Sequence, residues 1–133
     1  MSVIVGSEHL SRQGTKVVVA ALAKNSETLG VEVVYTPEPG IYWALPLEEF
    51  EAEKPWTPSA ARPSFTVALG KHTHFKGGEY EVVCRLRHPH SLVNLIAYKN
   101  TLDELWLRPE SMFLEEVEWM DGVRRLRFLR SSR

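Results

Sequence analysis

The sequence predicts an all-β protein made of two small β units in tandem, and three observations support this prediction. Segments such as "EYEVVCRLR" (79–87) alternate apolar and charged residues with a period of two, which is typical of half-buried strands. Turn signals such as Asp121-Gly122 separate these short segments. The chain also matches itself when it is shifted by 63 positions.

The internal match includes rare aromatic residues at one register. A shift of 63 places Trp43 on Trp106 and Phe50 on Phe113, and it also places Pro46 on Pro109. We therefore interpret residues 1–56 as a degenerate copy, 57–69 as a linker and 70–133 as the intact copy. Below, residues 1–63 are called the first half and 64–133 the second half, and residues 63 positions apart are called matched.

Each element of the second half follows from its pattern. The alternation in 79–87 predicts a strand with Val82, Cys84 and Leu86 on one face, and "LVNLIAY" and "ELWLR" predict two more. "PESMF" predicts a tight turn, and a two-residue type I′ turn at Asp121-Gly122 predicts a final hairpin. Five short strands in this order favour a small SH3-like barrel in each half.

The first half adds two expectations. "KVVVAALAK" (16–24) is apolar on both faces, with Val17, Val19 and Ala21 on one of them, so the strand needs cover on both sides. We expect the second cover to be the other half or, in a homodimer, a second chain. The acids of "LEEFEAE" (47–53) are expected on the solvent face of a strand.

Composition narrows the function classes. A net charge of -1 gives no whole-molecule attraction to nucleic acid or membranes, and no apolar run approaches the roughly 18 residues that a membrane span needs. The single Cys84 cannot form an internal disulfide, which favours the cytoplasm. We expect this thiol to be a buried small hydrophobe, and we expect no cofactor and no catalysis.

The second half resembles a known family. "HFKGGEYEVV", "LWLRPESMF" and "VEWMDGVRRLRF" are similar in order and type to a small bacterial family, the domain of unknown function 1653, from Gly70 to Phe128. The loop "HPHS" departs from the family pattern. The resemblance implies a small β fold and no established activity. The first half keeps the tryptophan, proline and phenylalanine of this pattern, but it has Ser11, Gln13 and Leu45 where the second half has a histidine, a lysine and an arginine.

The comparison of the two halves selects a candidate binding site. Arg108 lies two residues from Trp106 on one strand face, with Tyr98 on the neighbouring strand, and an arginine beside aromatic rings suits an anion. His74, Lys76 and His88 join it at the rim. The structural alternative is that Trp106 is core and Arg108 pairs with a nearby glutamate or with backbone carbonyls. Because Leu45 replaces the arginine in the first half, the fold tolerates its loss.

Two further function classes stay open as alternatives. The pairs His72/His74 and His88/His90 have the i, i+2 spacing of chelating residues on a strand, which would suit a small metal-dependent enzyme. The basic run "VRRLRFLR" would suit a nucleic-acid-binding accessory protein. The predicted two-residue turn, however, places Glu118 opposite Arg125 and Glu116 opposite Arg127, and these pairs disfavour nucleic acid. We therefore predict a non-catalytic module that binds a small anionic or peptide-like ligand.

Overall fold

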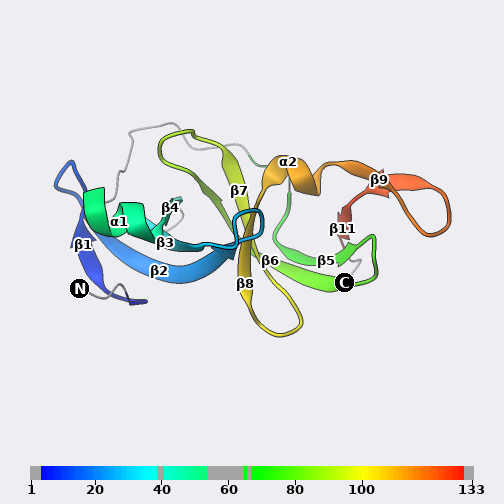
Figure 1. Ribbon diagram of the computed structural model, residues 1–133, viewed down its shortest axis with the longest axis horizontal. Helices are drawn as coiled ribbons and strands as arrows, with labels where there is room; N and C mark the ends of the chain where they lie inside the picture. The colour runs from blue at the N-terminus through cyan, green and yellow to red at the C-terminus, as the bar shows by residue number, and fades with distance from the viewer. Residues whose placement is uncertain (1–3, 39–40, 54–64, 66, 131–133) are drawn as a thin grey trace.

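The computed structural model describes residues 4–38, 41–53, 65 and 67–130 (Figure 1). Strands make up 54% and helices 9%, so the predicted β character is confirmed. Neither described helix is long and apolar enough to cross a membrane. The predicted linker falls largely on residues outside the described ranges. The elements are β1 (Glu8–Leu10), β2 (Lys16–Asn25), β3 (Val31–Glu38), β4 (Ile41–Pro46), α1 (Leu47–Glu53), β5 (Gly70–His74), β6 (Glu79–Arg87), β7 (Asn94–Lys99), β8 (Leu105–Pro109), α2 (Glu110–Phe113), β9 (Glu116–Glu118), β10 (Arg124–Leu126) and β11 (Phe128–Arg130).

Six strands close into one barrel to which both halves contribute. The sheet runs β6-β4-β3-β2-β8-β7 and returns to β6. Neighbours from the same half are antiparallel. The halves join through two parallel pairs, with Trp43 beside Arg87 and Lys24 beside Trp106. Two separate SH3-like barrels are therefore not confirmed, because the strand edges that would close each small barrel pair with the other half instead.

Three pairs of elements in the two halves start at matched positions. The pairs β2 and β6, β3 and β7, and α1 and α2 each begin 63 residues apart. Leu29 and Leu92, also 63 apart, both have positive φ, of 63° and 60°. A leucine rarely adopts this conformation, so its occurrence at the same place in both turns shows that the sequence register corresponds to a structural one.

Three hydrophobic cores explain why several strands are buried on both faces. One core fills the barrel with small and medium side chains from both halves, among them Val34, Ala44 and Leu107. Each half also has its own outer core on the other side of its strands. In β3, for example, Val33 and Tyr35 point to the outer core and Val34 to the barrel interior. The second cover that the first half needs is thus the other half of the same chain.

Two matched β-bulges redirect the side chains of the longest strands. The register shifts between Val19 and Ala21 in β2 and between Val82 and Cys84 in β6. Because a bulge adds one residue to one strand, Val19 faces the outer core and Ala21 the barrel. The expectation that they share a face is wrong, and so is the one that placed Val82 with Cys84.

A helix covers each outer core. Phe50 of α1 packs on Tyr35 with ring centroids 5.4 Å apart, and Phe113 of α2 stacks on Phe128 at 4.1 Å. The expectation of a strand for "LEEFEAE" is wrong because Leu47 and Phe50 lie one helical turn apart and both reach the core. Acidic residues in the first turn also suit the helix dipole. Figure 1 shows α1 at one end of an elongated molecule and α2 nearer its middle, with the hairpin that contains β9 at the other end.

The last hairpin has a longer loop than predicted. The backbone N–H of Trp119 donates to the Val123 carbonyl, and the backbone N–H of Gly122 donates to the Trp119 carbonyl. Three residues, 120–122, therefore form the loop. Gly122 has a φ of 82°, the left-handed conformation that a three-residue hairpin loop places at this position. The two-residue turn is therefore wrong, and the cross-strand register moves by one, with Glu118 opposite Arg124.

Candidate functional site

Arg108 lies half-buried on β8 against the outer core of the second half. Its Nε donates to the Tyr98 hydroxyl at 3.2 Å. Its guanidinium carbon is 5.9 Å from the centre of the Tyr98 ring and 5.7 Å from that of Phe128. The predicted contact between Arg108 and Tyr98 is therefore present. Stacking on aromatic faces fixes a guanidinium while leaving most of its N–H donors available.

The charge of Arg108 has no carboxylate partner among the described residues. Its contacts there are the tyrosine hydroxyl and the two aromatic rings. In the described part of the chain Arg108 makes neither the ion pair with a glutamate nor the hydrogen bonds to backbone carbonyls that the structural alternative expects. The matched Leu45 is 1% exposed in the first outer core, so this position in the fold is filled equally well by an apolar side chain.

His74, at the end of β5, belongs to the same cluster. Its ring centroid is 4.8 Å from that of Phe128 and 5.9 Å from that of Tyr80. The backbone N–H of Lys76 donates to His74 Nδ1 at 3.2 Å, which places the proton of the neutral ring on Nε2. We call Tyr98, Arg108, His74 and Phe128 the Arg108 site.

His74 is partly buried and lies near several cations. Burial lowers its pKa to about 4, and the charges of Arg108, Arg127 and Lys76 contribute further. A second cation on the ring is disfavoured, so His74 is neutral at pH 7. The Arg108 site therefore combines nearby cations, a neutral donor and aromatic walls.

This pKa predicts acid destabilisation. The folded protein binds a proton at His74 less tightly than the unfolded chain, whose histidine has the ordinary pKa of 6.5. Burial of the neutral His74 ring therefore does not reduce the free energy of unfolding above pH 6.5, but the free energy of unfolding falls as the pH drops toward 4. Urea midpoints at pH 7, 5.5 and 4.5 measure it, with His74→Ser as the matched variant because Ser11 occupies this place in the first half. We expect a shallower loss in the variant; parallel pH profiles would show that His74 contributes nothing.

Trp106 has a different neighbour from the one predicted. The Nζ of Lys24 in the first half lies 5.6 Å from its ring centre, and the guanidinium carbon of Arg87 lies 5.9 Å from the matched Trp43. Each tryptophan thus contacts a cation from the other half, at the two parallel strand pairs. Both tryptophans also pack on the outer core of their own half, as the structural alternative expected for Trp106. Lys76 is exposed and reaches the Arg108 site through its charge.

His88 lies away from the Arg108 site. Its Nδ1 accepts from the backbone N–H groups of His90 and Ser91 at 3.3 and 3.4 Å. The matched Asn25 makes the same two contacts through its side-chain oxygen. Burial lowers the pKa of His88, and the charges that influence it include Glu32 of the first half. His88 therefore shapes a turn, and the structure does not bring it together with Arg108.

The other histidines also have local partners. His72 is 4% exposed, its Nδ1 is 3.0 Å from the Gly70 carbonyl oxygen, and its ring meets the face of Phe113 at 6.2 Å. In the first half, the matched His9 meets Phe50 at 5.0 Å in the same way. No group of three or more His, Cys, Asp or Glu residues that could hold a metal occurs within the described ranges.

The basic hairpin is neutralised, though by other partners than predicted. Arg125 pairs with Asp121 at 2.7 Å, and Arg127 pairs with Glu115. Arg124 donates to the Glu116 backbone carbonyl at 3.0 Å. The predicted pairs of Glu118 with Arg125 and Glu116 with Arg127 are wrong because the longer loop shifts the register by one.

Sequence reasoning missed Phe128 and Arg127 as members of this region. Phe128 stacks under the guanidinium of Arg108, and β11 places it there by pairing Phe128 with His74. Arg127 lies 5.2 Å over the Phe75 ring. The signal was present, because the Arg-Phe ending of the last hairpin is part of the family resemblance.

The comparison with known families agrees with that resemblance. The sequence model of the family described as "Protein of unknown function (DUF1653)" matches residues 70–130, which contain the whole Arg108 site. None of the curated proteins or solved structures compared with the chain matches it.

Proposed function

We propose that this chain, which carries the DUF1653 match in its second half, is a non-catalytic binding protein for a small anionic or peptide-like group at the Arg108 site. The observation that supports this proposal most is the set of contacts that the Arg108 guanidinium makes. Its guanidinium is held by a hydroxyl and two aromatic rings, without a carboxylate among the described residues. A carboxylate or phosphate would supply that partner through charge-assisted hydrogen bonds.

The surroundings favour an anion over other ligands. Arg127 and Lys76 add positive charge to that of Arg108, and His74 offers a donor without a charge of its own. The aromatic side chains around the guanidinium limit its contact with water, which strengthens its interaction with a negative group. The flat rings of Tyr98 and Phe128 suit a ligand that carries a planar part beside its charge.

In this proposal the first half is a copy of the same unit that has kept the fold but lacks the polar residues of the Arg108 site and its rim. Leu45, Ser11 and Gln13 stand where the second half has Arg108, His74 and Lys76. Both halves would descend from one SH3-like unit, and the closed barrel would be the result of fusing two of them. A single free cysteine supports a reducing compartment such as the cytoplasm.

Thermal shift against a small panel of anions tests the proposal. The probes are inorganic phosphate, citrate and a short peptide with either a free or an amidated C-terminus. We expect stabilisation by at least one anion, and for the peptide only in its free-acid form. Arg108→Leu should fold, since Leu45 packs at the matched position, and should weaken binding by about 10- to 100-fold.

The matched control is Arg125→Leu, which removes the same charge from the hairpin and should bind as the original protein does. Equal anion binding by Arg108→Leu would refute the site. Steeply salt-dependent binding to oligonucleotides, or stoichiometric zinc in the purified protein, would favour the nucleic-acid or the metal-enzyme alternative instead.

A further inference from the structure

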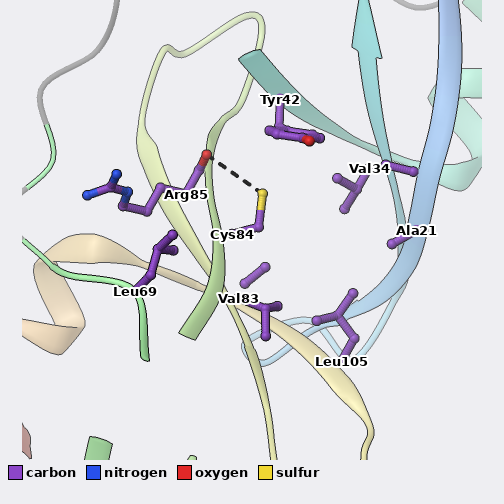
Figure 2. Close-up of a pocket in the computed structure, with 10 residues that line it drawn as sticks. Ala21, Val34, Tyr42, Leu69, Val83, Cys84, Arg85 and Leu105 are labelled. Carbon is purple, nitrogen blue, oxygen red and sulfur yellow. Dashed lines mark hydrogen bonds between the residues drawn. The ribbon is translucent and has the colours of Figure 1, made fainter. Parts of the chain in front are cut away.

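A second site lies in the barrel itself, away from the Arg108 site. A cavity of about 340 Å³ opens between strands of both halves and shares no lining residue with the Arg108 site. Figure 2 shows its two walls, with Val83 and Cys84 on one side and Tyr42, Val34, Ala21 and Leu105 around the other. Because each half supplies part of the lining, the cavity exists only in the assembled barrel.

Residues at the two bulges line this cavity. Ala20 and Ala21 line it from β2, and the matched Val83 and Cys84 line it from β6. Both strands bulge at these residues. Bulges redirect side chains and are over-represented next to functional sites. A cavity costs stability because its lining loses packing contacts, and the barrel's hydrogen-bonded strands prevent it from collapsing.

The lining specifies an uncharged ligand. No carboxylate lines the cavity, and the Arg85 guanidinium turns aside to the Val67 carbonyl oxygen at 3.5 Å and to the Phe65 ring at 5.7 Å. The hydroxyl of Tyr42 has no hydrogen-bond partner among the described residues. The thiol of Cys84 has only a weak contact with the Arg85 carbonyl, at 3.8 Å. Two weakly engaged donors in an apolar cavity favour a ligand with one acceptor.

The size of the cavity limits the ligand further. Benzene fills an apolar cavity of about 150 Å³, so a cavity about twice as large accommodates a fused two-ring molecule. Leu69 and Val83, which are 45% and 37% exposed, line the cavity and offer apolar surface to an entering ring. We propose that the barrel cavity binds a small, uncharged aromatic molecule of about ten non-hydrogen atoms, whose single acceptor takes a hydrogen bond from Tyr42.

Quinoline and naphthalene form a matched pair of probes, because they have the same shape and only quinoline has an acceptor. Binding is followed at pH 8, where quinoline is neutral, through the backbone amide signals of residues 20–21 and 83–84. We expect quinoline to bind about three- to tenfold more tightly than naphthalene, and Tyr42→Phe to abolish that difference. Ala21→Leu should fill the cavity and abolish binding of both, while Leu102→Ala, an exposed apolar residue elsewhere, should change nothing.

A second measurement does not depend on how a variant folds. Burial raises the pKa of the Cys84 thiol to about 11, so alkylation by iodoacetamide is slow, and bound quinoline should slow it further. The proposal is overturned if quinoline at millimolar concentration neither perturbs these amides nor protects Cys84. Equal binding by Ala21→Leu, or a preference for 1-naphthoate over quinoline, would also overturn it.

Discussion

Separating the chain between residues 63 and 64 is expected to leave neither half folded as a monomer. Each half would lose the parallel strand pairs β2–β8 and β4–β6 and would expose its share of the barrel core. Exposing a buried side chain such as Leu86 or Leu107 costs about 1.5–3 kcal/mol, and domains of this size have only a few kcal/mol of stability to lose. Two such leucines are enough to unfold the second half.

Circular dichroism and sedimentation of the separate halves, alone and mixed, measure this effect. Alone, each half should show no cooperative unfolding as a monomer. Mixing the halves should restore one cooperative transition, because the barrel interior is then complete. Two halves that were each monomeric and cooperatively folded would show that the barrel is not the unit of stability.

Phe113→Ala is expected to cause a loss of about 3–5 kcal/mol in the free energy of unfolding. Phe113 is 1% exposed, stacks on Phe128 and contacts Tyr98 at 5.4 Å. Its removal leaves a large cavity in the outer core that α2 covers. Urea denaturation measures the loss.

Two control substitutions test whether the loss comes from the outer core or whether any truncation to alanine destabilises the protein. Phe50→Ala removes the matched side chain, which is 3% exposed in the first outer core, and should cost a similar amount. Met120→Ala alters a side chain that is 94% exposed and should stay within about 0.5 kcal/mol. If Phe113→Ala were as mild as Met120→Ala, the outer core would not be what holds α2 in place.

The sequence predicted the strands of this fold better than the way in which they assemble. Alternation identified β6, and the register of 63 anticipated the matched starts of the elements. The bulges were missed because the change of face between Val19 and Ala21 leaves no mark in a strand that is apolar throughout. Pairing of β2 with β8 was beyond prediction, because hydrophobic pattern does not say which strand edges meet.

Sequence pattern predicted only the part of the candidate site that lies on neighbouring strands. Arg108 and Tyr98 lie on neighbouring strands, so local pattern was sufficient to place them together. His88 was assigned to the site through the family pattern, but it lies at the far end of β6 from His74 and supports a turn. Phe128 reaches the site through the pairing of β11 with β5, a contact between distant segments that periodicity does not reveal.

The Nε–H signal of Arg108 is the most direct measure of the proposed anion site, since this group donates to the Tyr98 hydroxyl and belongs to the guanidinium that would bind the anion. In ¹H–¹⁵N spectra it is identified by its disappearance in Arg108→Leu. We predict that the bound anion found by thermal shift moves this signal in a saturable way, while the Arg125 signal stays in place. An Arg108 signal that does not move while the anion binds would contradict the proposal.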